Sequence, residues 1–519
     1  MAHFTARVAA NRGGAIALID DRRTLSWAEL DARTNQLVHA LRAAGLQVQD
    51  TIAVFAGNCV EYFEIMLACT HSGIVFVPVN WHFSAEELAY VINDSGAKLL
   101  LVEDAYLATA ETAIARGETP TLTKCISIRG QADGFEAFED FVADQPTTDP
   151  KAQCLGGPMF YTSGTTGRPK GVKSSTFAAG ADLATMELIG GGLAQMLSIP
   201  NDGTTYICGP VYHSAQWAFS FLPFINGSQV VMRHRFDGEQ ALMDIDTHNV
   251  TNVHLVPTQF HRLLRVEETA RNGFDGKSLQ VVWHGAAPCP PTVKQAMIDW
   301  WGHVIFEYYG STEGSIVTTA TSEDWLAKPG TVGKPTPIVE ITIRDDDGNV
   351  VDTGESGEIF VKNLMGSDFE YHNEPEKTAS VHLEPGTYTF GDIGYLDDDG
   401  YLFLSDRKID MIISGGVNIY PAEIEAVLVT HPRIEDAAVF GIPNEEFGEE
   451  VKAAVKLCPG VDANDALAED LIQHCRDHLA GYKAPRSIDF VDEFPRHETG
   501  KLYKRLLRDR YWQDRTSNI

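Results

Sequence analysis

The stretch from residue 227 to residue 310 decides the fold. It begins with "GSQVVMRHR" (227–235), continues through the strand-like runs "VHLVP" (253–257) and "LQVVWHG" (279–285), and ends with "VIFEYYG" (304–310). Stretches with helical spacing separate these runs: "FDGEQALMDIDTHNV" (236–250), "TQFHRLLRV" (258–266) and "PPTVKQAMIDWW" (290–301). This alternation predicts parallel strands covered by helices on both faces. We therefore expect an α/β fold with doubly wound sheets.

Unusual residues follow several of the expected strands. The segments are "GPVYHSAQW" (209–217), "HGAAP" (284–288) and "YYGSTEG" (308–314). Ligands of parallel sheets bind where loops leave the carboxyl ends of the strands. These segments are therefore candidate parts of a ligand site.

The sequence pattern of the chain changes twice after this region. From residue 330 to residue 363 it is turn-rich and strand-like, with an Asp-Gly-Asn turn at 347–349. After Asp406 a shorter mixed unit begins with "MIISGG" and "PAEIEAVLVT". We predict a large domain with a β-rich subdomain over residues 1–406, followed by a small mobile α+β domain over residues 407–519.

Charge and hydropathy exclude several classes of partner. The 519 residues include 41 basic and 72 acidic side chains, a formal charge of −31, and no strong basic patch interrupts this balance. Such a charge repels phosphate backbones and anionic membrane surfaces. Nowhere does the chain offer the roughly 18 consecutive apolar residues of a membrane span. We expect no nucleic-acid partner and no integral membrane span.

The cysteines and the first residues bear on location. Eight cysteines are scattered without a C-x-x-C pair, and the first residues lack the apolar block of a secretory signal. Scattered, reduced thiols are typical of the cytoplasm. We expect a cytoplasmic protein, and a homodimer stays open.

The segment "YTSGTTGRPKG" (161–171) is suited to binding a polyphosphate. Its glycines leave backbone N–H groups unobstructed, its hydroxyls add donors, and Lys170 adds positive charge. It is not a Walker loop, because Pro169 and Val172, five positions after Gly164 and Gly167, stand where that spacing requires the second glycine. Taken alone, the segment is equally compatible with a surface loop.

Several segments, in this order along the chain, resemble the signature set of the adenylate-forming (AMP-binding) superfamily. They are "YTSGTTGRPKGV", "YYGSTEG", "GDIGYLDDDGYL", "DRKIDMIISGGVNIYPAEIE" and "PRHETGKLYKRLLR". That superfamily includes acyl-CoA synthetases, firefly-type luciferases and the adenylation domains of peptide synthetases. The resemblance implies that a carboxylate attacks the α-phosphate of ATP with Mg²⁺, and that the thiol of coenzyme A then displaces AMP.

The resemblance also assigns residues to the nucleotide. It implies that the β- and γ-phosphates are held by Thr162, Ser163, Gly164, Thr165, Thr166, Gly167 and Lys170. It implies an adenine slot formed by Gly285, Ala286, Ala287, Pro288 and Tyr309. In "YYGSTEG", it implies that Gly310, Ser311 and Thr312 contact the nucleotide, with Thr312 at the α-phosphate. It implies that Glu313 and Thr166 bind magnesium.

Asp392 and Arg407 resemble the clamps on the ribose hydroxyls. Without the resemblance, Asp392 could equally be a turn residue and Arg407 an exposed charge, while Glu313 could be a helix-capping carboxylate. These alternatives stay open at the level of sequence.

Lys501 stands where a helix is expected to begin, although cations are disfavoured near the positive end of a helix dipole. The resemblance makes Lys501 the bridge between the attacking carboxylate and the α-phosphate; the alternative is a surface lysine. Gly415 and Gly416 would let the backbone approach the pantetheine arm of CoA.

The small domain is expected to present Lys501 in one orientation and the Gly415 loop in another. This implies a hinge at residues 406–410. The chain departs from the common pattern there and elsewhere, with Ile409 at the hinge position, Phe390 in place of a threonine, Thr387 in place of a tryptophan and Val417 in place of a glutamate.

The segment "YHSAQWAFSFLPF" (212–224) resembles the wall of the acyl pocket, with His213 near the carboxylate. Apolar lining is expected from Trp217, Phe221 and Val256, opposite the small residues Gly285 and Ala286, and this suggests a hydrophobic fatty, aryl or steroid side-chain acid. His213 could instead be a core histidine. The alternatives for the whole protein are a stand-alone enzyme that loads a carrier protein, a luciferase-like oxidase, and a binding protein without chemistry.

Overall fold

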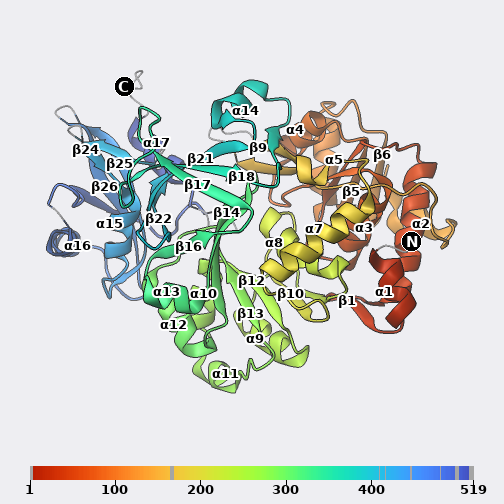
Figure 1. The fold of residues 1–519 in the computed structure, drawn as a ribbon, viewed down its shortest axis with the longest axis horizontal. Helices are drawn as coiled ribbons and strands as arrows, with labels where there is room; N and C mark the ends of the chain where they lie inside the picture. The colour runs from red at the N-terminus through yellow and green to blue at the C-terminus, as the bar shows by residue number, and fades with distance from the viewer. Residues whose placement is uncertain are drawn as a thin grey trace.

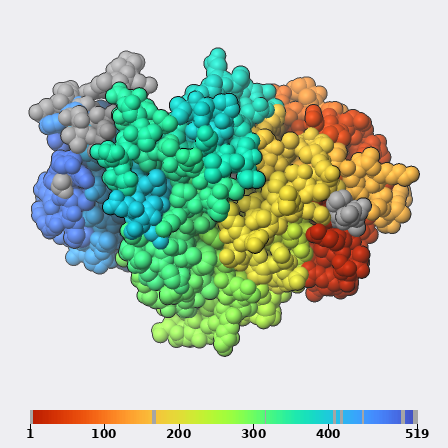
Figure 2. All heavy atoms as spheres, in the orientation of Figure 1, coloured from red at the N-terminus to blue at the C-terminus, as the bar shows by residue number. Residues whose placement is uncertain are grey.

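The computed structural model describes residues 4–163, 169–407, 410–414, 417–444, 447–479, 481–496 and 502–512. The molecule is elongated, with the N-terminal residues at one end and the C-terminal residues at the other (Figures 1 and 2). The strands and helices between residues 227 and 310 fill its middle. They include the predicted alternation, so the expected α/β fold is confirmed.

The N-terminal sheet is entirely parallel. Its order is β4 (Val75–Pro78), β3 (Thr51–Phe55), β5 (Leu99–Glu103), β6 (Lys124–Ile128) and β7 (Glu136–Ala137). The surrounding helical segments are α1 (Phe4–Arg12), α2 (Trp27–Ala43), α3 (Val60–Ser72), α4 (Ala85–Ser95), η1 (Asp104–Tyr106), α5 (Leu107–Ala115) and α6 (Phe138–Ala143). Every residue of α3 is buried, which is the pattern of a helix enclosed by the core on all sides.

The central sheet contains the predicted strands. Its parallel members are β11 (Gln229–Met232), β10 (Thr204–Ile207), β12 (Asn252–Leu255), β13 (Val281–His284) and β14 (Ile305–Ser311). From the start of the chain, β1 (Ile16–Ile19) joins β11 in parallel, and β2 (Thr24–Ser26) closes the edge antiparallel to β1. The helices of this part are α7 (Leu183–Met196), α8 (Ser214–Ile225), α9 (Gly238–Thr247), α10 (Pro257–Leu264), α11 (Glu268–Gly273) and α12 (Pro291–Trp301). Of the helices between residues 227 and 310, only α11 has no counterpart in the prediction.

The same sheet continues beyond β14 with antiparallel pairing. The further strands are β15 (Ser315–Ala320), β16 (Thr331–Pro335), β22 (Leu402–Arg407), β21 (Thr387–Leu396), β18 (Gly357–Asn363) and β17 (Val339–Arg344), with β20 (His382–Glu384) beside β21. The connecting helices are α13 (Ser322–Ala327) and α14 (Pro375–Val381). The predicted turn forms with Gly348 at a φ of 83°. β14 is therefore the strand at which parallel and antiparallel pairing meet.

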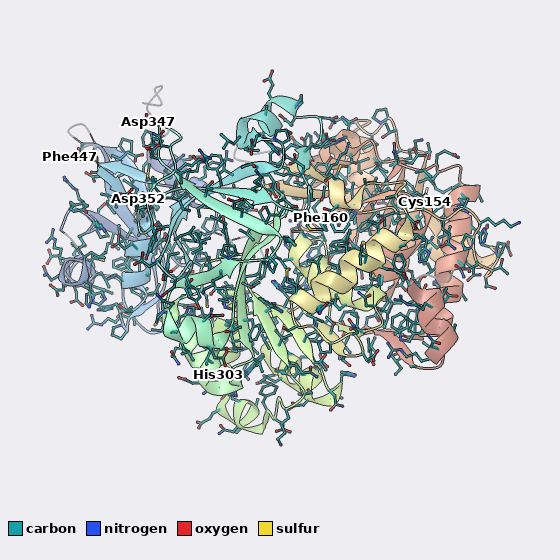
Figure 3. All side chains as sticks on the ribbon, viewed as in Figure 1. Cys154, Phe160, His303, Asp347, Asp352 and Phe447 are labelled. Atoms are coloured by element: carbon teal, nitrogen blue, oxygen red, sulfur yellow. The ribbon has the colours of Figure 1, made fainter. Side chains whose placement is uncertain are left out.

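A small three-stranded sheet carries the phosphate-loop motif. β8 (Phe160–Ser163) and β9 (Pro169–Ser174) are the two arms of the motif, and β19 (Phe369–Tyr371) pairs with β9. β9 leads into the short helix η2 (Ser175–Phe177). Phe160, at the start of β8, lies near the middle of the molecule (Figure 3) and is buried. The arms of the motif are thus anchored in the interior.

The C-terminal residues form a separate five-stranded sheet. Its strands are β24 (Val417–Ile419), β23 (Ile412–Ser414), β26 (Gly448–Leu457), β25 (Ile434–Asn444) and β27 (Ser487–Phe490), and its helices are α15 (Pro421–Leu428), α16 (Asp465–His478) and α17 (Lys504–Trp512). Phe447 lies at the far end of the molecule (Figure 3). The domain boundary between residues 406 and 407 stays a prediction, and it falls just before the last residue of β22.

None of the helices in the described part of the chain has both the length and the apolar composition that crossing a membrane requires.

Candidate active site

The ends of β13 and β14 lie so close together that residue 285 must be small. A Cβ atom on Gly285 would lie 2.6 Å from Cε1 and 2.7 Å from the backbone oxygen of Tyr308. The next residue, Ala286, has a φ of 65°, a left-handed conformation that costs energy in residues with a side chain and is concentrated at functional sites. Ala286 and Pro288 are exposed and Ala287 is half-buried. The predicted adenine slot is thus a tight, open turn.

A buried ion pair supports this turn from behind. Lys294 of α12 contacts Glu307 of β14, and both side chains are buried. His284 is fully buried with Nε2 3.8 Å from Glu307 Oε2, and its pKa lies well below the usual range because burial and the Lys294 cation disfavour the imidazolium. His284 is therefore neutral, and the charges behind the slot balance each other.

The predicted ribose clamp is joined to the predicted adenine contact. The Tyr309 hydroxyl donates to Oδ2 of Asp392 at 2.7 Å, and both side chains are buried. Asp392 on β21 is in register with Arg407 on β22. The structure brings these backbones together as the sequence predicted, whereas the side chain of Arg407 lies outside the described residues.

The predicted magnesium ligand is held by a tyrosine that the sequence reasoning missed. The Tyr371 hydroxyl donates to Oε1 of Glu313 at 3.1 Å. Tyr371 is the last residue of β19 and pairs with Val172 of β9. Glu313 is thereby linked to the sheet that carries the phosphate-loop motif. Because 58 residues separate the two partners, no local pattern could have indicated this contact.

The phosphate-loop motif is described along its two arms. Thr162 pairs with Lys170 across β8 and β9, and the Lys170 side chain is buried. The predicted residues Gly164, Thr165, Thr166 and Gly167, together with the side chain of Ser163, lie outside the described residues. The structure therefore locates Lys170 on β9. The phosphate-binding role of the residues between the two arms stays a prediction.

The end of β14 is also tied to the start of α8. A hydrogen bond of 2.7 Å joins the hydroxyls of Ser214 and Thr312, and Ser311 Oγ accepts from the backbone N–H of Gly314 at 3.0 Å. His213 is the N-cap residue of α8, immediately before Ser214. Thr312, the predicted α-phosphate contact, follows Gly310 and Ser311 at the end of β14. The bond to Ser214 brings it close to His213, the histidine predicted to lie near the carboxylate.

The departure at residue 390 has a packing explanation. A Cβ atom on Gly314 would lie 2.3 Å from Cζ of Phe390. The Phe390 ring also meets the ring of Tyr309 edge-on, with centroids 6.2 Å apart. A large side chain at 390 and a glycine at 314 thus fill one space together, directly behind the turn that carries Glu313.

Two aromatic residues of the expected acyl wall pack in the N-terminal core. Trp217 and Phe221 stack on each other, and Trp217 contacts Phe160 and Phe177. On the other side of α8, Phe219 packs on the ring of Tyr308 of β14, with centroids 5.0 Å apart. That Trp217 and Phe221 line the acyl pocket stays a prediction. α8 is apolar on most of its surface, so its sequence does not reveal which face meets which neighbour.

The remaining predicted residues lie outside the described part of the chain. They are Gly415, Gly416, Lys501 and the hinge residue Ile409, together with the side chain of Val417.

The donors fit a magnesium ion carried by ATP. Mg²⁺ keeps most of its water ligands and binds through one or two carboxylates and the phosphates of the substrate. Glu313 is half-buried, and Tyr371 occupies one of its two oxygens. Within the described ranges no cluster of three or more His, Cys, Asp or Glu residues could hold a metal. Glu313 can therefore contribute one ligand to a magnesium ion that arrives with the phosphates of ATP.

Comparison with known proteins decides the family. The model of the AMP-binding enzyme family matches residues 5–365, and that of the AMP-binding enzyme C-terminal domain matches residues 423–501. The chain belongs to the AMP-binding enzyme family. The expectation of an AMP-forming ligase of the acyl-CoA synthetase type is thereby confirmed.

Relatives of this AMP-binding enzyme align over nearly its whole length. A feruloyl-CoA synthase of an Amycolatopsis species is 33% identical over 94% of both chains. A fatty acid–acyl-carrier-protein ligase of Streptomyces coeruleorubidus is 31% identical over 97% of this chain and 95% of its own. Among solved structures, o-succinylbenzoate CoA synthetase from Bacillus subtilis, in complex with its acyl-adenylate, is 28% identical with a TM-score of 0.81, over 100% of this chain and 99% of its own.

Proposed function

We propose that this AMP-binding enzyme is an ATP-dependent acyl-CoA synthetase that activates a hydrophobic carboxylic acid. The observation that carries the proposal is that Thr312, Glu313 and Asp392 surround the end of β14, each held by a neutral hydroxyl. Those hydroxyls belong to Ser214, Tyr371 and Tyr309. These hydroxyls fix the direction of the two carboxylates and of the Thr312 side chain.

The first reaction brings two anions together, the carboxylate of the acid and the α-phosphate of ATP. Thr312 supplies a hydroxyl donor at this point, and Lys170 supplies positive charge from β9. Asp392 accepts hydrogen bonds from ribose hydroxyls, and Tyr309 offers its ring to the adenine. Magnesium, when bound through Glu313 and Thr166, would neutralise phosphate charge. Preorganised groups of this kind lower the barrier by stabilising charge as it develops.

Lys501 and the glycines at 415 and 416 complete the proposal. Lys501 would bridge the carboxylate and the α-phosphate, and the glycines would admit the pantetheine arm of CoA during thioester formation. Changing Lys501 to alanine should slow adenylation by a factor on the order of 10²–10³. Pyrophosphate exchange at the wild-type rate in that variant would contradict this role.

A carrier protein is the alternative thiol donor. The relative from Streptomyces coeruleorubidus is named as a ligase for an acyl-carrier protein, whereas the relative from Amycolatopsis is named as a CoA synthase. The test is a panel of fatty, aryl and alicyclic acids incubated with ATP, Mg²⁺ and CoA. AMP formation with release of free acyl-CoA supports the proposal, and acid-dependent pyrophosphate exchange without acyl-CoA favours the carrier-loading enzyme.

A cytoplasmic location is part of the proposal. All eight cysteines are free, as expected in a reducing compartment. A homodimer stays open and can be settled by the mass of the purified protein in solution.

A further inference from the structure

A chain of buried hydrogen bonds runs from α8 to β14. Gln216 Nε2 lies 2.8 Å from Nδ1 and 3.3 Å from the backbone oxygen of His254. His254 Nε2 lies 3.1 Å from the Tyr308 hydroxyl. All three side chains are buried, and the rings of Phe219 pack on those of His254 and Tyr308.

The contacts decide which group donates. A backbone carbonyl only accepts, so the atom of Gln216 that faces it is the amide nitrogen, and His254 Nδ1 accepts from the same nitrogen. Burial lowers the pKa of His254 to about 3, so the ring is neutral and carries its single proton on Nε2. That proton goes to the oxygen of Tyr308. The hydroxyl proton of Tyr308 is left for another acceptor, and none is found among the described residues.

Tyr308 lies beside the reaction site on the side of the acid. Its ring edge borders Gly285, and it is followed on β14 by Tyr309, which contacts Asp392 on the side of the ribose. Neighbouring residues of a strand face opposite sides. The bond between Ser214 and Thr312 brings the start of α8 to the point where the carboxylate is expected. The body of the acid would therefore extend between α8 and β14, along Phe219 and Tyr308.

We propose that Tyr308 donates a hydrogen bond to an acceptor on the body of the acid, and that His254 and Gln216 act as positioning residues that keep its proton directed there. The substrate class is then an acid with a carbonyl, ether or hydroxyl oxygen beyond its carboxylate, rather than a plain hydrocarbon acid. This inference rests on the proposed function and names the substrate class of the same site.

Matched pairs of acids test the assignment. We would measure kcat/KM for pyrophosphate exchange with para-methoxycinnamate against para-ethylcinnamate, anisate against para-ethylbenzoate, and octanoate against its analogue with a ketone at the penultimate carbon. The wild type should prefer the oxygen-bearing member of at least one pair by roughly tenfold, the size of one well-placed hydrogen bond. In Tyr308→Phe the ratio should fall close to one, with the hydrocarbon member still activated.

Gln216→Leu separates positioning from packing. Without the amide, His254 can carry its proton on Nδ1 and accept from Tyr308, so the preference should fall as it does in Tyr308→Phe. The control is Tyr62→Phe, which removes a buried hydroxyl that has no hydrogen-bond partner in the described structure from the N-terminal core, and its preference should equal that of the wild type.

The outcomes are distinct. Equal rates for both members of every pair in the wild type would overturn the assignment, as would an equal loss for both members in Tyr308→Phe. Absence of pyrophosphate exchange with every acid would overturn the proposed function itself, and the assignment with it.

Discussion

Two groups of carboxylates, one near the N-terminal sheet and one near the end of β14, are held in different ways. Near the N-terminal sheet, Asp20 and Glu61 both contact the guanidinium of Arg129, and Glu103 accepts from the backbone N–H of Gly57 at 2.8 Å. Near β14, Asp392 and Glu313 are each held by the hydroxyl of a tyrosine. The described contacts of the first group thus include the Arg129 cation, whereas those of Asp392 and Glu313 include tyrosine hydroxyls that donate to one carboxylate oxygen each.

The difference also explains why a pocket alone does not identify a site. A pocket of about 470 Å³ lies beside the first group and is lined by Asp20, Glu103, Arg129 and His234 among others. Its polar groups already contact one another: Arg129 pairs with Asp20, and His234 Nε2 lies 3.2 Å from Glu103 Oε2. We therefore interpret the first group as structural and the group at β14 as functional.

The largest effect is expected from a substitution that removes the cation of the structural group. Arg129→Met would leave Asp20 buried without its cation and Glu61 with Arg23 alone, which should lower the free energy of unfolding by about 3 to 5 kcal/mol. Urea unfolding followed by tryptophan fluorescence measures this loss. Nucleotide affinity, measured under conditions where the variant is folded, should not change.

The matched control is Arg22→Met, since Arg22 is more than half exposed and forms a surface pair with Asp104, which is worth roughly 0 to 1 kcal/mol. Equal stability of the two variants would show that the Arg129 group is not a structural support.

Unfolding at low pH should also show that stability depends on the pair between Asp20 and Arg129. Burial alone would raise the pKa of Asp20, but the N–H donors of Val60 and Arg22 and the guanidinium of Arg129 hold it below its usual range. The stability that Asp20 contributes is therefore present above its unfolded pKa and is lost as the pH falls through the lower folded pKa. Arg129→Met should start to lose this contribution at a higher pH than the wild type. Identical acid unfolding curves, after correction for the difference at neutral pH, would argue against the pairing.

A further variant tests the packing that supports the turn with Glu313 in the functional group. Gly314→Ala would drive a methyl group into Phe390, shift the turn that carries Glu313, and lower kcat/KM for pyrophosphate exchange by roughly 10²-fold. The double variant Gly314→Ala with Phe390→Ala should recover most of this loss, because the two closest contacts are removed and the nearest remaining atom, Cε2 of Tyr388, lies 3.0 Å from the added methyl group. Gly192→Ala on α7, where an added Cβ meets nothing within 4 Å, serves as the control. Failure of the second substitution to restore activity would contradict the packing explanation.

The smallest expected effect concerns the tyrosine that holds Glu313. Tyr371→Phe removes one hydrogen bond to a carboxylate and should lower kcat/KM by roughly threefold to tenfold, with a weaker response to Mg²⁺. Tyr401→Phe, which removes a hydroxyl that donates to the carboxylate of Asp324, should leave the magnesium dependence unchanged. If the two variants titrate identically with Mg²⁺, Tyr371 does not position Glu313.

The sequence predicted much of this molecule because its signals are local. The alternation of apolar runs and helical spacing between residues 229 and 311 gave the strands and helices of the central sheet, and glycine-rich motifs marked the turns of the slot. The motif resemblance assigned Asp392 and Arg407 to the same ribose, and the structure places the two backbones in register on β21 and β22.

Contacts between distant segments could not be predicted in this way. Tyr371 meets Glu313 only because β19 pairs with β9, and Gln216 meets His254 only because α8 crosses β12. The contact of Phe219 with Tyr308 could not be predicted for the same reason: a helix that is apolar on most sides does not reveal its neighbours. The roles of Gly164, Thr166, Gly415 and Lys501 rest on the motif resemblance alone.

The central claim is that a carboxylate held by a neutral hydroxyl serves the nucleotide, and binding to Asp392→Asn tests it most directly. Asparagine can still accept from Tyr309, so the local structure should persist while the charge is lost. Calorimetric titration with α,β-methylene ATP and Mg²⁺ should give an affinity lower than that of the wild type by roughly tenfold to a hundredfold, with unfolding by urea unchanged. An unchanged affinity in Asp392→Asn would contradict the account.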